Sequence, residues 1–206
     1  QKVLTLNTGN PAAFGFKMPD SIKKAITENI DKSLGYCDLR GMIAAREAIC
    51  NYHLENGIKN ICPDNVFITN GVSEAAYMAI TAICSPNDEV LVPSPCYSLW
   101  VNMIRLCGGK AVFYDCQEEN GWQPDLEDIK AKITEKTKAV LLINPNNPTG
   151  AVYSKEVVKA VYDLAKEKNL IILSDEIYDR LVFAEAKHTC TATLGNDVTI
   201  MAFSGL

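Results

Sequence analysis

Apolar residues recur along the chain in two patterns that alternate with each other. In the first pattern they lie three or four positions apart, as Ile22, Ile26 and Ile30 do, and polar residues fill the intervals. This spacing places the apolar side chains on one face of a helix. The helices that it predicts cover residues 20–33, 41–56, 72–84 and 97–107, a short stretch after Asp125, and 155–168.

The helix predicted over 155–168 also carries clear end signals. Ser154 is a residue type that caps helix starts, and lysines close the last turn, where cations are favourable. Gly57 similarly ends the helix predicted over 41–56. These signals make the helix boundaries more specific than the apolar spacing alone.

The second pattern consists of short, nearly continuous apolar runs between the helices, which is typical of strands covered on both faces. Strands that alternate with helices in this way form a largely parallel sheet. The sequence therefore predicts an α/β fold, with three α/β/α layers and a mostly parallel sheet. The predicted strands are 66–69, 90–92, 111–114, 139–143, 170–173 and 198–201.

The first 40 residues do not follow this alternation of strand and helix. We therefore expect residues 1–40 to form an N-terminal arm that contacts other parts of the assembly. Residues 41–206 are expected to form the main domain.

In an open α/β sheet, ligands bind beyond the carboxyl ends of the strands. The segments that follow the predicted strands are polar, aromatic and rich in turn residues. We expect them to lie along one edge of the sheet and to form the functional site. They are Asn70–Glu74, Pro93–Tyr97, Asn144–Gly150, Ser174–Tyr178 and Phe203–Gly205.

Gly71, Val72 and Ser73 stand at the predicted start of a helix. Backbone N–H groups, a hydroxyl and the positive end of the helix dipole suit a phosphate there. The alternative is an ordinary turn in which Ser73 lies near the cap. Neither a GxGxxG fingerprint after a strand nor a GxxxxGK[ST] loop occurs, which argues against a dinucleotide or P-loop site.

Four other side chains at this edge have both a functional and a structural interpretation. Asp175 either caps a helix or holds its charge for a cationic partner, and Tyr178 can share its pocket. Tyr97 is either a stacking surface or part of the core, and core is the better interpretation from its sequence context alone. Asn147 stands in a proline-rich loop that either orients a ligand or simply makes a turn.

Composition and charge exclude several classes of protein. The 206 residues are 48% hydrophobic and 22% charged, which is close to globular averages and unlike a disordered chain. The net charge is −5 and the lysines and arginines are scattered, so we expect no nucleic-acid partner. No apolar stretch approaches the about 20 residues of a membrane span, and no signal pattern stands at the front.

The eight cysteines show no CxxC spacing and no nearby histidine at zinc-ligand distance, so no metal site is expected. Most of them stand in apolar segments, which indicates reduced thiols and a cytoplasmic protein. His53 and His188 are isolated in the sequence, and we interpret both as structural or surface residues. Arg40 and Arg46 stand in no recognisable carboxylate-binding context.

Taken together, these segments resemble the fold-type I, pyridoxal-phosphate (PLP)-dependent aminotransferases of class I/II. The resemblance covers nearly the whole chain, with its motifs in the order of the family. The residues in these motifs most resemble those of the bacterial glutamate–pyruvate (alanine) aminotransferases. The motifs are Leu6–Pro11, Gly35–Asp38, Arg46–Ile49, Asn70–Glu74, Pro93–Tyr97, Asn144–Gly150 and Ser174–Tyr178.

This resemblance implies roles for the site residues around the cofactor ring. Asp175 would pair with the pyridine nitrogen, and Tyr97 would stack on the ring. Tyr178 and Asn147 would bind the phenolic oxygen, with Asn147 also near the substrate carboxylate.

The resemblance also implies contacts outside the ring. The segment Gly71–Ser73 would hold the phosphate, with Ser204 as a further, weaker phosphate contact. Tyr36 would reach the phosphate of a partner subunit, which implies a homodimer. Gly9 would lie in a loop that covers the substrate.

The implied reaction moves an amino group between an amino acid, with alanine and glutamate favoured, and a 2-oxo acid. The lysine that forms the Schiff base with PLP is expected just after Leu206, so none of the 206 residues is assigned a catalytic role. We therefore expect this chain alone to be inactive. A family strand from beyond this point is expected to insert into the sheet, which would leave a gap here.

Two alternatives remain open at this stage. A PLP-dependent carbon–sulfur β-lyase shares nearly all of these motifs, and its substrate would be cystathionine rather than alanine. The other is a non-catalytic product, a fragment or pseudo-enzyme that binds the cofactor or only a partner subunit. A lysine within a few positions after Leu206 in the parent protein would exclude the pseudo-enzyme.

Overall fold

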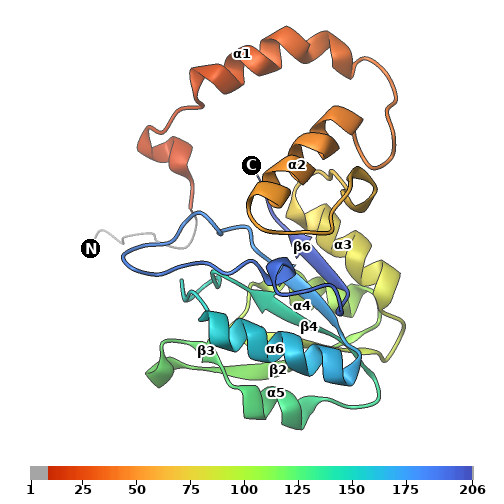
Figure 1. The fold of residues 1–206 in the computed structure, drawn as a ribbon, viewed down its shortest axis with the longest axis vertical. Helices are drawn as coiled ribbons and strands as arrows, with labels where there is room; N and C mark the ends of the chain where they lie inside the picture. Colours follow the sequence, from red (N-terminus) through yellow and green to blue (C-terminus); the bar gives the residue numbers. More distant parts are fainter. Residues whose placement is uncertain (1–8, 206) are drawn as a thin grey trace, which may run out of the picture. The chain divides into compact units, whose positions relative to one another are not determined.

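The computed structural model describes residues 9–205, and the chain divides into two compact units between Asp38 and Leu39 (Figure 1). The first unit contains η1 (Pro11–Phe14), α1 (Asp20–Asn29) and η2 (Ile30–Ser33). The helix predicted over 20–33 is thus confirmed, with a last turn that tightens into a 3₁₀ helix. Its apolar stripe of Ile22, Ile26 and Ile30 is exposed.

The second unit is built on a six-stranded sheet in the order β3-β2-β1-β4-β5-β6. All neighbouring strands are parallel except β2 and β3, which are antiparallel. The predicted, mostly parallel sheet is confirmed. The strands are β1 (Glu89–Ser94), β2 (Lys110–Gln117), β3 (Gln123–Pro124), β4 (Thr137–Ile143), β5 (Ile171–Asp175) and β6 (Ile200–Phe203).

Helices cover both faces of this sheet, because alternate residues of the buried strands feed two separate hydrophobic clusters. Val140 and Leu142 of β4 pack with Val158 of α6 on one face. Leu141 of β4 packs with Ile80 of α3 on the other face. The predicted three-layer fold is therefore confirmed (Figure 1). The α-helices of the second unit are α2 (Ile43–Glu55), α3 (Val72–Ile83), α4 (Ser98–Leu106), α5 (Leu126–Lys132) and α6 (Lys155–Lys168).

Local sequence signals explain where two of these helices begin. The Ser154 hydroxyl accepts a hydrogen bond from the Val157 N–H at 3.2 Å, which caps α6 as predicted. Asp125 caps α5 by accepting from the Glu127 N–H at 2.9 Å and the Asp128 N–H at 3.2 Å. Both caps satisfy donors that a helix leaves unpaired in its first turn.

The strand predicted over residues 66–69 is wrong. This segment belongs to no strand, and the Ile68 N–H donates instead to the Arg40 carbonyl at 2.9 Å. A run of β-branched residues becomes a strand only where a neighbouring strand supplies its hydrogen bonds. Neighbours among the six strands are all hydrogen-bonded, so the expected gap does not lie between them.

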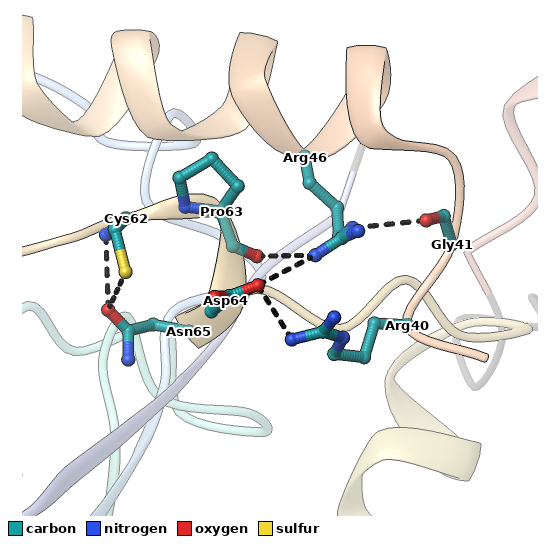
Figure 2. Close-up of polar contacts among 7 residues, drawn as sticks. All are labelled: Arg40, Gly41, Arg46, Cys62, Pro63, Asp64 and Asn65. Carbon is teal, nitrogen blue, oxygen red and sulfur yellow. Dashed lines mark hydrogen bonds and ion pairs between the residues drawn. The ribbon is translucent and has the colours of Figure 1, made fainter. Parts of the chain in front are cut away.

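Arg46 is buried, with 3% of its surface exposed, and joins α2 to the turn at 62–65 (Figure 2). Its Nε donates to the Gly41 carbonyl at 3.0 Å, and its Nη1 donates to the Pro63 carbonyl at 2.9 Å. Asp64 forms ion pairs with both arginines. Its Oδ1 lies 3.6 Å from Arg46 Nη1 and 2.7 Å from Arg40 Nη1. Arg46 is therefore a structural residue in this unit.

The turn that Arg46 binds is itself held by a side chain. Asn65 Oδ1 accepts from the Cys62 N–H at 3.1 Å and lies 3.1 Å from the Cys62 Sγ, closing η3 (Pro63–Asn65) as Figure 2 shows. This closed turn presents the Pro63 carbonyl to the guanidinium.

We expect Arg46→Met to lower the free energy of unfolding by about 2 kcal/mol, because two half-buried residues, Gly41 and Pro63, lose the buried donor of their carbonyls. Urea unfolding at pH 7 measures the change. Arg40→Met is the matched control, since the Arg40 side chain is 34% exposed and a partly exposed pair contributes about 0–1 kcal/mol. Equal losses in the two variants would contradict this account of Arg46.

Candidate functional site

The carboxyl ends of β4, β5 and β6 are level with one another. In the parallel register Ile143 pairs with Asp175, and Asp175 pairs with Phe203. The ladder continues one residue further, with the Asn144 N–H donating to the Asp175 carbonyl at 2.9 Å. The Glu176 N–H donates in the same way to the Phe203 carbonyl at 2.8 Å. The segments that follow these three strands therefore leave from one edge, as predicted.

Asp175 places a carboxylate at this edge with only 3% of its surface exposed. Its Oδ2 accepts from the Trp100 indole N–H at 2.7 Å, and its Oδ1 accepts from the Ile177 N–H at 3.3 Å. Burial raises the pKa of the Asp175 carboxyl, partly offset by these two hydrogen bonds, and neighbouring Glu176 raises it further.

The residues after Asp175 form a turn and not a helix, so Asp175 does not cap a helix. Among residues 9–205, no cationic side chain forms an ion pair with Asp175. A carboxylate that is buried without a cation is costly unless a ligand supplies one. The arrangement thus favours the second interpretation from the sequence, a charge held for a cationic partner.

Trp100 was missed as a functional residue in the sequence. Its side chain is fully buried in α4, and its ring meets Phe203 edge-on, with centroids 4.9 Å apart and planes at 75°. The helical spacing places Trp100 in the core and gives no sign of a polar partner 75 residues away. Its position three residues after Tyr97, at the start of a helix that follows a strand, was the only signal.

Tyr97 is 44% exposed, so the interpretation as a core residue is wrong. It stands immediately before α4, where the chain leaves β1 at the same edge of the sheet. The thiol of the neighbouring Cys96 lies close enough to Asp175 for the Asp175 charge to affect its pKa. Burial first, and then the charge of Asp175, raises the pKa of the Cys96 thiol to about 12, which keeps the thiol neutral.

The start of α3 has the features of an anion site. Gly71 precedes the helix with φ 78°, and no side chain caps the helix start. A Cβ at Gly71 would meet no atom within 4 Å, so the approach to this backbone is open. Val72 packs against the cluster that contains Trp100, and Ser73 is exposed. The first-turn N–H groups of a helix are its unpaired donors, which favours the phosphate interpretation.

The asparagines of the loop after β4 have separate roles. Asn144 Oδ1 accepts from the Tyr153 N–H at 2.9 Å, and Asn146 Nδ2 donates to the Tyr153 hydroxyl at 3.1 Å. Asn146 Oδ1 also accepts from the Thr149 hydroxyl at 2.9 Å. Asn147 is half-buried, and its side chain makes no hydrogen bond within the described part of the chain. Of these residues, Asn147 is therefore the one available to a ligand.

The remaining predicted residues differ in how far the structure places them. Tyr178 lies in the turn after Asp175 and is partly exposed, and Ser204 follows β6 and is exposed. Gly9 and Tyr36 belong to the first unit and are both exposed. Their approach to the sheet edge stays a prediction.

Glu176 follows Asp175 directly, and its side chain fixes the backbone at this point. Its buried Oε1 accepts from the Ser174 hydroxyl at 2.8 Å and from the Thr191 N–H at 3.0 Å. His188 Nε2 lies 3.6 Å from Glu176 Oε2, so His188 has the structural role expected for it. Burial, followed by the Glu176 charge, raises the pKa of the Cys190 thiol to about 12.

A separate hollow lies at the opposite edge of the sheet. This cavity of about 450 Å³ is bordered by Thr137, Ile171 and Thr199, which stand near the strand starts. Its charged rim is already paired, as in the 2.6 Å contact between Lys166 Nζ and Asp197 Oδ2. We therefore place the functional site at the carboxyl edge, where the buried Asp175 carboxylate has no cationic partner among residues 9–205.

Known proteins match the whole length of this chain in sequence and fold. A family model described as aminotransferase class I and II matches residues 1–206. The chain belongs to this family. The resemblance inferred from the motifs is thereby confirmed, as is the fold class.

Relatives within the family include named alanine aminotransferases. The chain is 48% identical over 205 residues to the glutamate-pyruvate aminotransferase AlaA of Haemophilus influenzae, matching 100% of this chain and 51% of that protein. It is 45% identical to the alanine aminotransferase of Mycobacterium tuberculosis, matching 100% and 48%. An aminotransferase structure from Escherichia coli has a TM-score of 0.96 at 45% identity, covering 100% of this chain and 51% of that one. The chain spans about half the length of the curated relatives it matches.

The edge residues of this family member fit PLP by their chemistry. A buried carboxylate without a cation suits a protonated ring nitrogen, and the uncapped start of α3 suits a phosphate. The buried Asn144 Nδ2 has no hydrogen-bond partner among residues 9–205 and belongs to the loop that carries Asn147. Within the same residues, no cluster of His, Cys, Asp and Glu could hold a metal ion, and no helix has the length and apolar character to cross a bilayer.

We expect Asn146→Ala to lower the free energy of unfolding by about 1–3 kcal/mol, because the buried Tyr153 and the half-buried Thr149 lose their hydrogen bonds. Faster amide hydrogen exchange at Gly150 and Ala151 should accompany it. Asn147→Ala serves as the control and should change stability by less than about 0.5 kcal/mol. The division of roles in this loop is contradicted if Asn147→Ala destabilises as much.

Proposed function

We propose that the protein containing this chain is a PLP-dependent aminotransferase that moves an amino group between an amino acid and a 2-oxo acid. The observation that carries the proposal is the buried Asp175 carboxylate, which faces no cation at the ligand-binding edge. Alanine and glutamate are the proposed amino donors. The names of the relatives from Haemophilus influenzae and Mycobacterium tuberculosis support this choice.

The residues at the edge divide the recognition of the cofactor among them. Asp175 would accept the proton of the ring nitrogen, and the backbone of Gly71–Ser73 would bind the phosphate. Tyr97 would cover the ring, and the Tyr178 hydroxyl and Asn147 amide would bind the phenolic oxygen. When bound, PLP supplies an electron-accepting ring that stabilises negative charge at the substrate α-carbon.

In this scheme Asp175 binds the cofactor and also keeps a proton on its ring nitrogen. A carboxylate in a water-poor site holds a proton on a neighbouring nitrogen more strongly than it would in water, because the local dielectric is low. A ring that stays protonated is a better electron acceptor. Burial raises the pKa of Asp175 in the cofactor-free protein, and a bound cation beside the carboxylate would lower it.

Further parts of the proposal rest on the family resemblance. The lysine that bonds to PLP and moves the α-proton is expected after Leu206, and an arginine for the substrate carboxylate further on. A homodimer would bring Tyr36 to the partner's phosphate, and Gly9 would cover the substrate. The eight free cysteines agree with the proposed cytoplasmic location.

The full-length protein loaded with PLP should convert alanine and 2-oxoglutarate into pyruvate and glutamate. Coupled lactate dehydrogenase measures the pyruvate. Cystathionine supplied alone should give no pyruvate, and pyruvate from cystathionine would show a β-lyase instead. Absence of both reactions from protein that has bound PLP would show a non-catalytic relative.

Asp175→Asn should lower kcat by about 100-fold or more, because the neutral amide no longer holds the ring proton. Asp163→Asn is the control, since Asp163 lies on the exposed side of α6 and pairs only with Lys159 there. Initial rates at saturating PLP measure the change. Unchanged kcat in Asp175→Asn would overturn the role given to Asp175.

The same substitution should stabilise the cofactor-free protein at pH 7. The folded state raises the pKa of Asp175, so its ionised form opposes folding above that pKa, whereas the neutral acid does not. The advantage of Asp175→Asn in the free energy of unfolding should therefore shrink as the pH falls toward about 4, the ordinary Asp pKa. Urea unfolding between pH 4 and 8 tests this, and an advantage independent of pH would contradict it.

A further inference from the structure

We propose that Trp100 is a positioning residue, whose indole N–H fixes the Asp175 carboxylate in the orientation that receives the ring nitrogen of the cofactor. The inference rests on the proposed function, because it concerns how the same carboxylate is held. It assigns a role to a residue that would otherwise count only as core.

The hydrogen bond between the two residues has the geometry of a charge-assisted contact. The distance from Trp100 Nε1 to Asp175 Oδ2 is 2.7 Å, at the short end of the range for N–H donors to carboxylates. An ionised carboxylate has about four acceptor positions. The indole and the Ile177 N–H occupy two of them, which leaves positions for a ring N–H.

The chemical nature of the donor matters as much as the distance. An indole N–H only donates and does not titrate near neutral pH. Trp100 therefore stabilises the negative charge of Asp175 without adding a proton that the carboxylate could take. The ring nitrogen of the cofactor is left as the proton-bearing partner of this carboxylate.

Packing holds the indole in place on the sheet. Trp100 is fully buried, and Phe203 at the end of β6 meets its ring edge-on at 4.9 Å. Ile80 of α3 and Val92 of β1 belong to the same hydrophobic cluster. The donor on α4 is thus fixed relative to the end of β5, and the carboxylate that it binds is restricted with it.

The other groups near Asp175 do not substitute for this donor. Glu176 is acidic and opposes ionisation of Asp175, and the Cys96 thiol is neutral. Within residues 9–205, Trp100 is the one side chain that donates a hydrogen bond to Asp175, with the Ile177 backbone as its companion.

The test compares cofactor affinity in Trp100→Phe, which removes the N–H and keeps an aromatic ring, with wild type. Equilibrium dialysis of the full-length protein should show PLP binding weakened about 10- to 100-fold, the range for a hydrogen bond to a charged group. Trp122→Phe is the matched control, since Trp122 is a partly buried residue of the other cluster and should leave affinity unchanged. Equal affinities in wild type and Trp100→Phe would overturn the proposal.

Two further arms show that the effect passes through Asp175. In an Asp175→Asn background, Trp100→Phe should cause little additional loss, because the carboxylate on which it acts is gone. A deaza analogue of PLP, with carbon in place of the ring nitrogen, should bind wild type and Trp100→Phe equally. Full additivity in the double variant, or equal weakening for the analogue, would show a merely structural role.

A spectroscopic arm covers the case in which Trp100→Phe fails to fold. In Trp122→Phe, Trp100 is the only tryptophan of the 206 residues, which contain two, and any tryptophan elsewhere in the full-length protein is replaced by phenylalanine in both backgrounds. Its fluorescence in the cofactor-free protein should change with pH as Asp175 ionises, and Asp175→Asn should abolish that change. A pH profile that is the same in both backgrounds would overturn the proposal.

These outcomes are separable from failure of the proposed function. If wild-type full-length protein does not bind PLP at all, the proposed function fails. If it binds PLP and Trp100→Phe binds equally well, only the role of Trp100 fails.

Discussion

The parallel pairing of β4, β5 and β6 is the constraint on which the rest of the site depends. Its register brings Ile143, Asp175 and Phe203 to one level, so three chain segments that are distant in sequence leave the sheet together. Each segment then contributes a different chemistry to the same edge: an amide loop, a buried carboxylate and a hydroxyl. Helices α3 and α4 pack on one face of the sheet, in the hydrophobic cluster that contains Trp100.

Asp175 shows how the fold accommodates a charge that its own residues do not neutralise. The surrounding apolar cluster opposes ionisation, while the indole and one backbone N–H favour it. The ionised carboxylate that would bind a cation therefore lowers the stability of the cofactor-free fold at this position. A site that is slightly unfavourable when empty is well suited to a cationic ligand, because binding removes the unfavourable term.

Local chemistry explains which features the sequence could predict. Ser154 accepts from an N–H group three residues away, so its cap could be predicted from the sequence, and the helix after Asp125 was predicted as well. The strand predicted at 66–69 failed because pairing depends on a distant partner. The bonds of Trp100 to Asp175 and of Arg46 to Pro63 also join distant positions, and no residue-type pattern announces them. Asn147 was singled out in the sequence, whereas the structural roles of Asn144 and Asn146 depend on bonds to Tyr153 that the sequence does not announce.

The buried carboxylate of Glu176 has a consequence for how the chain can vary. By binding both Ser174 and Thr191, it joins the two ends of the segment that runs outward through Leu181 and Phe183. Both of those side chains are exposed. Insertions or deletions near Leu181 and Phe183 would lengthen or shorten the stretch between the joined ends without moving Asp175. This stretch is therefore a place where the length of the chain can change while the carboxylate at the end of β5 stays in position.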